Sequence, residues 1–203
     1  MKKLTFILSV VVSLFIAGHA FATPILDQVS DFEGSNNVLN ASNPIFTWQQ
    51  QVTVGVAGEL VGVELYRQDW YQGLPLYNGE IAFSLNKGSG WQTDSNDYYS
   101  VLKLANNLSW NYIDVSSANL TFDIGDHFII GITGTDGGTG LAMQGGQYNP
   151  YLGGSLYLNG FDHPYYLCFK TWVDPTPVPE PSTMLLLGSG LLGLWGFRRK
   201  FRK

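Results

Sequence analysis

Residues 79–86 read GEIAFSLN, with a large apolar side chain at every second position from Ile81 onward. Successive side chains of an extended chain point to opposite faces, so Ile81, Phe83 and Leu85 share one face. A period of two is typical of a β-strand that buries one face in a core. Turn-forming residues bound the segment, with Asn78-Gly79 at its start and KGSG at 87–90 after it. The stretch therefore predicts a half-buried strand and points to a β fold.

The same period recurs along the chain. Two segments each place three apolar side chains on one face: Val61, Val63 and Leu65 in residues 58–67, and Leu120, Phe122 and Ile124 in residues 119–125. Further strands are predicted at residues 47–56, 99–105, 110–116, 126–134, 153–160 and 165–173. About nine short strands without a helical stripe predict an all-β fold, a single antiparallel β-sandwich of jelly-roll type.

The predicted sandwich covers residues 23–172, and the Pro-rich residues 173–178 are expected to form an extended linker after it. Residues 23–177 hold 15 of the 16 acidic side chains but only four of the 11 basic ones, a net charge of −11. A body this acidic repels phosphate backbones, which argues against a nucleic-acid partner.

The N-terminus has the three parts of a secretory signal peptide. Lys2 and Lys3 precede an apolar run, and small residues follow with Ala20 and Ala22 in an A-x-A pattern. Cleavage after Ala22 is expected to remove residues 1–22, so the mature chain is predicted to be exported.

The C-terminus is a second membrane-directed segment. Pro179, Glu180 and Pro181 precede an apolar run at 182–197, which as a helix would be roughly 24 Å long. This is short for a hydrocarbon core of about 30 Å, so a short transmembrane helix is predicted. A basic tail ends the chain and is expected to stay cytoplasmic; it consists of Arg198, Arg199, Lys200, Arg202 and Lys203.

This combination of Pro-Glu-Pro, apolar span and basic tail resembles the PEP-CTERM sorting signal of Gram-negative bacteria, over residues 179–203. The resemblance implies recognition by an exosortase, a membrane-embedded enzyme that removes the tail during export to the cell surface. It also implies transit through the inner membrane, a final place at the surface or in the extracellular matrix, and exopolysaccharide-producing, biofilm-forming organisms. A plain C-terminal anchor with incidental prolines is the alternative.

No arrangement of side chains in residues 23–177 points to catalysis. His127 and His163 each follow an aspartate, but neighbours on a strand face opposite ways and cannot easily bind one ion. Cys168 lies in an apolar run and is expected to be a buried strand residue. The chain is therefore predicted not to be an enzyme and to need no cofactor.

Calcium suits an acidic extracellular β-domain, where it binds oxygen ligands in loops. Asp94, Asn96 and Asp97 form one candidate cluster, and Asp136 lies in another loop. The order of residues differs from that of an EF-hand loop, and such side chains also cap turns without an ion. Turn formation is the preferred interpretation, and calcium remains an alternative.

Carbohydrate binding is the sharpest hypothesis for the exported domain, because exposed aromatic rings stack on sugars and nearby polar groups bind their hydroxyls. Trp70, Tyr71, Tyr148 and Tyr151 lie in two loops that mix aromatic and amide side chains. The alternative is that these aromatics fill cross-strand pairs. The leading prediction is an exported surface or matrix protein with a structural or adhesive role, and the alternative is a module that binds extracellular polysaccharide.

Overall fold

The computed structural model describes residues 23–31, 37–41, 44–69, 78–93, 96–135, 138–145 and 151–175. In this part of the chain every regular element is a strand except one 3₁₀ turn, Ser116–Ala118. No helix in these ranges has the length and apolar character needed to cross a membrane. The predicted signal peptide and the predicted helix at 182–197 lie outside the described residues.

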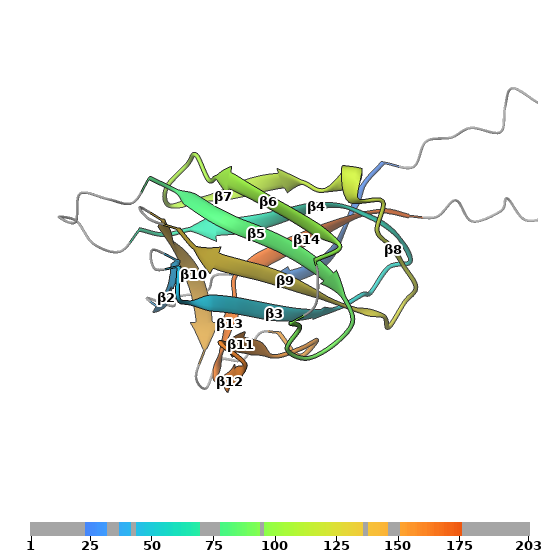
Figure 1. The fold of residues 1–203 in the computed structure, drawn as a ribbon. Coiled ribbons are helices and arrows are strands. Elements are labelled where there is room, and N and C mark those ends of the chain that lie inside the picture. The colour runs from blue at the N-terminus through green and yellow to red at the C-terminus, as the bar shows by residue number, and fades with distance from the viewer. Residues whose placement is uncertain are drawn as a thin grey trace, which may run out of the picture.

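Two antiparallel sheets form the fold (Figure 1). The first is eight-stranded within the described residues, with the order β1 (Ile25–Ser30), β14 (Phe169–Pro175), β4 (Gly58–Arg67), β10 (Thr139–Gly145) and β13 (Tyr165–Leu167). Its other strands are β2 (Asn37–Ala41) on β10, and β7 (Ser109–Asp114) and β8 (Thr121–Phe122) on β4. The second has the order β12 (Phe161–His163), β11 (Leu156–Leu158), β3 (Thr47–Thr53), β9 (His127–Gly134), β5 (Glu80–Lys87) and β6 (Tyr98–Lys103).

Eight of the strands wind between the sheets as in a jelly roll. One sheet contains the neighbours β1-β14-β4-β7, and the other contains β3-β9-β5-β6. The chain passes back and forth between these two sets of neighbours, in the order β1, β3, β4, β5–β6, β7, β9 and β14. This order is that of a double-sheet jelly roll. The prediction of an antiparallel all-β sandwich is confirmed.

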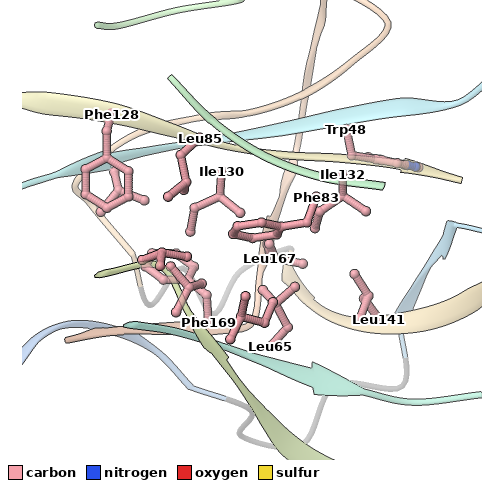
Figure 2. Packing of buried hydrophobic residues seen from close by; sticks show 14 of the residues in the cluster. Trp48, Leu65, Phe83, Leu85, Phe128, Ile130, Ile132, Leu141, Leu167 and Phe169 are labelled. Atoms are coloured by element: carbon pink, nitrogen blue, oxygen red, sulfur yellow. The ribbon is translucent and has the colours of Figure 1, made fainter. Parts of the chain in front are cut away.

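The core lies between the two sheets. Ile81, Phe83 and Leu85 on β5 are fully buried, as the alternation of GEIAFSLN predicts. Figure 2 shows Phe83 from one sheet facing Leu65 and Phe169 from the other. Burying these side chains removes apolar surface from water. Each Å² buried stabilises the fold by about 25 cal/mol, and this holds the two sheets together.

A bulge changes the predicted face of β4. Trp172 pairs with Gly62 and Val173 with Leu60, so Val61 has no partner in the ladder with β14. The inward alternation therefore shifts by one residue, and Leu60 is buried in the core while Val61 is only half-buried. The prediction that Val61 shares a buried face with Val63 and Leu65 is wrong for this reason.

Two other predicted boundaries also change. Leu120 and Phe122 are buried, but the strand ends at Phe122 and Ile124 lies in a turn with 71% of its surface exposed. Strand β14 continues to Pro175 in register with β4, and Val173 is buried. The predicted linker therefore begins no earlier than residue 176.

The predicted strand at 165–173 is divided at Cys168. Its first part, β13, pairs with β10, and its second part, β14, pairs with β1 and β4. Strands β1, β2, β10 and β12 are not among the predicted segments. Their apolar patterns are short or interrupted by glycine and polar residues, so that only pairing with neighbours defines them as strands.

Candidate functional site

A groove of about 440 Å³ lies along the open edge of the sandwich. Strands β6 and β7 form its sides, and Figure 1 shows them next to each other at that edge. Within the described residues, β6 pairs only with β5 and β7 pairs only with β4. Each strand therefore has one edge free of strand pairing, where a ligand can reach backbone groups.

The groove lining combines aromatic, hydroxyl, amide and carboxylate side chains. Strand β6 contributes Tyr98, Ser100, Leu102 and Lys103; strand β7 contributes Trp110, Asn111, Tyr112, Ile113 and Asp114; the connecting loop contributes Leu104, Ala105 and Asn106. Ligand sites commonly combine apolar surface with a few polar groups in this way.

Tyr112 presents the most accessible ring of β7, with 55% of its surface exposed. The ring lies across Gly62 on β4, where an added Cβ would be 2.4 Å from Cε2 and 2.3 Å from the hydroxyl oxygen. The hydroxyl donates a hydrogen bond to the backbone oxygen of Val61 at 3.3 Å. Burial, followed by the charges of Asp114 and Glu64, raises the pKa of Tyr112 above its ordinary value. The ring is thus held at the β4–β7 surface while a large part of it stays open to solvent.

Asp114 places an ionised carboxylate at the groove. Its Oδ1 accepts hydrogen bonds from the hydroxyl of Ser116 at 2.7 Å and from the backbone N–H of Ser116 at 3.0 Å. These bonds lower the pKa of Asp114. The side chain is therefore oriented and charged at neutral pH.

A second aromatic group adjoins Tyr112 on the eight-stranded sheet. Trp110 makes an edge contact with Tyr66, with ring centroids 5.3 Å apart, and the ammonium of Lys170 lies 4.0 Å from its ring centroid. Glu64 lies 3.8 Å from Lys170 and accepts a hydrogen bond from the indole N–H of Trp172 at 2.9 Å. Aromatic rings and paired charges thus cover this part of β4, β7 and β14.

The C-terminal residues match a known family. Residues 177–200 match the family model of the PEP-CTERM protein-sorting motif. The chain carries a PEP-CTERM protein-sorting motif. No curated protein and no solved structure matches the chain significantly. The motif supports export and targeting to an exosortase, and the resemblance drawn from the Pro-Glu-Pro sequence is confirmed.

The predicted processing residues of this PEP-CTERM protein lie outside the described residues. They are Ala20 and Ala22 at the signal cleavage site, Pro179, Glu180 and Pro181 in the sorting motif, and Arg198, Arg199, Lys200, Arg202 and Lys203 in the basic tail.

Of the predicted sugar-contacting residues, Trp70, Tyr71 and Tyr148 also lie outside the described residues. Tyr151 is described, and only 4% of its surface is exposed. Its hydroxyl accepts a hydrogen bond from the backbone N–H of Thr53 at 2.9 Å. The expectation of an exposed Tyr151 is wrong, because the ring packs in the core against Phe169 with centroids 5.0 Å apart.

The histidines of the PEP-CTERM protein have separate local partners. Nδ1 of His127 lies 3.0 Å from the hydroxyl of Thr53. His163 packs edge-on against Trp48, with centroids 5.1 Å apart, and burial lowers its pKa. Cys168 is fully buried, and burial, followed by the charge of Asp31, raises the pKa of its thiol to about 12.

The predicted calcium cluster is only partly described. Asp97 accepts a hydrogen bond from the backbone N–H of Lys87 at 2.6 Å, which is the turn-forming role considered for it. Asp94 and Asp136 lie outside the described residues. Among the side chains that the structure describes, no three His, Cys, Asp or Glu residues come together as a metal site.

The groove was not singled out from the sequence, although a signal for it exists. In the predicted strand at 110–116, Trp110, Tyr112 and Asp114 share one face, while Asn111 and Ile113 face inward and are buried. Two aromatics and a carboxylate on the outer face of one strand mark an unusual surface. What the sequence does not indicate is that this strand lies at a sheet edge, beside β6.

Proposed function

We propose that the protein is an exported, exosortase-processed surface or extracellular-matrix protein with a structural or adhesive, non-enzymatic role. The sorting motif at 177–200 carries this proposal. It follows the last described strand, which ends at Pro175, so a folded sandwich precedes the processing signal directly. The partners are an exosortase-type enzyme and, during transit, the inner membrane.

Pro179 and Pro181 suit a processing signal for a physical reason. Proline cannot continue a helix and biases the residue before it toward extended conformations. A protease binds an extended peptide more readily than a helix, because its backbone groups are free to pair.

The test is the intact mass and the C-terminal peptide of the mature protein, from membrane and secreted fractions separately. The expected product lacks the basic tail in the native sequence and retains it when Pro179 and Pro181 are both replaced by alanine. Pro164→Ala, at an exposed proline of the sandwich, is the matched control and should be processed normally. An intact tail in the native protein would show a simple anchored protein and refute the proposal.

A carbohydrate-binding role is the second candidate. The observation that favours it is the open ring of Tyr112 on β7, beside a groove whose lining contains hydroxyl, amide and carboxylate groups. A module that binds surface polysaccharide should be released from cells by washing with that polysaccharide in soluble form. Release by salt alone would instead indicate an electrostatic attachment.

A further inference from the structure

We propose that a neutral polysaccharide chain binds across β7 at the edge of the sandwich, with one sugar ring stacked on Tyr112 at the outer face and the chain continuing into the groove between β6 and β7. This inference rests on the second candidate function and specifies its site and ligand class. In this inference the ring that stacks on the sugar is the accessible Tyr112 and not the buried Tyr151. The loops that contain Trp70 and Tyr148 are not part of the proposed site.

The position of the Tyr112 ring is the first argument. Its underside is covered by the backbone at Gly62, and its hydroxyl is held by Val61, so the ring is ordered before a ligand arrives. An ordered ring loses little side-chain entropy on binding, which favours affinity. The exposed side offers a flat apolar surface of the kind that matches the apolar face of a pyranose.

The polar groups of the groove are the second argument. Asp114 is charged and oriented by Ser116, and Ser100 and Asn106 line the same groove. A carboxylate accepts hydrogen bonds, a hydroxyl donates and accepts, and an amide does both. A sugar presents hydroxyls that donate and accept, so Asp114 can bind a sugar stacked on Tyr112, while Ser100 and Asn106 can bind further sugars of the chain along the groove.

The negative charge of the domain favours a neutral polysaccharide over an anionic one. Residues 23–177 carry a net charge of −11, and the groove lining contains one cation, Lys103, and one carboxylate, Asp114. An anionic chain would approach against the field of the whole domain. A neutral chain is not repelled, and it can still donate hydrogen bonds to Asp114.

The test is affinity electrophoresis of the mature protein in native gels that contain dextran, laminarin, galactomannan or, as the acidic probe, alginate. At least one neutral polysaccharide should retard the protein, and alginate should not. Tyr112→Ala should weaken the retarding interaction about tenfold, the size of effect typical of an aromatic residue that dominates a binding surface. Tyr112→Phe keeps the ring and should remain within about threefold of the native protein.

The matched control is Tyr99→Ala. Tyr99 is also a tyrosine on an edge strand with 60% of its surface exposed, but it does not line the groove. Retardation that survives this change and is lost in Tyr112→Ala supports the inference. The inference is overturned if no neutral polysaccharide retards the protein, or if both alanine variants lose retardation equally. It is also overturned if sedimentation shows a dimer that Tyr112→Ala dissociates, since the groove would then be an interface between copies. The C-terminal mass of the same sample reports separately on exosortase processing.

Discussion

The ring of Tyr112 on β7 lies directly over Gly62 on β4, so closely that a Cβ at Gly62 would be 2.5 Å from Cζ. Only glycine at position 62 leaves room for the Tyr112 ring, since real Cβ atoms do not approach other atoms so closely. The absence of a side chain at one position of β4 therefore determines how a tyrosine on the neighbouring strand lies.

Gly62→Ala should displace the Tyr112 ring into solvent. Because more than half of the Tyr112 surface is already exposed, at 55%, moving the ring should change the free energy of unfolding by no more than about 1 kcal/mol. The pKa of Tyr112, which burial, Asp114 and Glu64 raise, should move down toward its ordinary value. NMR titration of ring-labelled tyrosine measures this change. An unaltered titration with normal stability would mean that the ring does not rest on Gly62.

Asp69→Ala should destabilise the sandwich strongly. Asp69 accepts hydrogen bonds from Nε of Arg67 at 2.9 Å, from the hydroxyl of Thr139 at 2.7 Å and from the backbone N–H of Gly140 at 3.1 Å. The side chains of Arg67 and Asp69 are only 8% and 11% exposed. Removing one member of a buried ion pair costs about 3–5 kcal/mol. Urea denaturation should show this loss, whereas Asp162→Ala at an exposed site should change stability by less than about 0.5 kcal/mol. Equal losses of stability in Asp69→Ala and Asp162→Ala would refute the stabilising role of the buried Arg67–Asp69 pair.

Cys168 should resist alkylation in the folded protein. The thiol is fully buried, and its pKa is raised to about 12, so it has almost no thiolate near pH 8. Iodoacetamide at about pH 8 should therefore leave the native protein unmodified and label it fully in urea. The chain has a single cysteine, so mass spectrometry gives the extent of reaction without ambiguity. Stoichiometric labelling without denaturant would contradict the buried position.

Tyr151 should contribute stability that disappears at alkaline pH. Burial is the largest cause that raises its pKa from 10.0 to about 12. A raised pKa means that the fold favours the neutral phenol, so the contribution is complete below pH 10 and is lost as the pH rises to about 12. Tyr151→Phe keeps the packing against Phe169 but removes the acceptor for the Thr53 N–H, at a cost of about 1–3 kcal/mol at neutral pH.

The difference in unfolding free energy between the native protein and Tyr151→Phe isolates this effect, because other titrating groups such as Cys168 are common to both. The difference should shrink between pH 10 and 12. A difference that stays constant across this range would show that the phenol ionises as freely in the folded state as in the unfolded state.

Gln50 shows why a strand can be predicted while its packing cannot. The segment TWQQQVT is extended as expected, yet Gln50 is fully buried. Its Oε1 accepts a hydrogen bond from the backbone N–H of Leu167 at 3.0 Å, and its Nε2 donates to the backbone oxygen of Gln51 at 2.8 Å. Gln49 instead binds the backbone of Gln92 from the opposite face of the strand. Three identical residues in a row contain no signal for this difference, because Leu167 and Gln92, which distinguish the two side chains, come from distant parts of the chain.

The sequence by itself determined the β class, the buried face of GEIAFSLN and the sorting motif. Each depends on neighbours in the chain: the alternation of side chains about an extended backbone, or a linear peptide that a processing enzyme reads. Only the tertiary structure decided the bulge at Val61, the burial of Tyr151 and the groove beside Tyr112. These depend on which strands become neighbours, and the pairing of β4 with β7 and β14 brings together residues that are far apart in the chain.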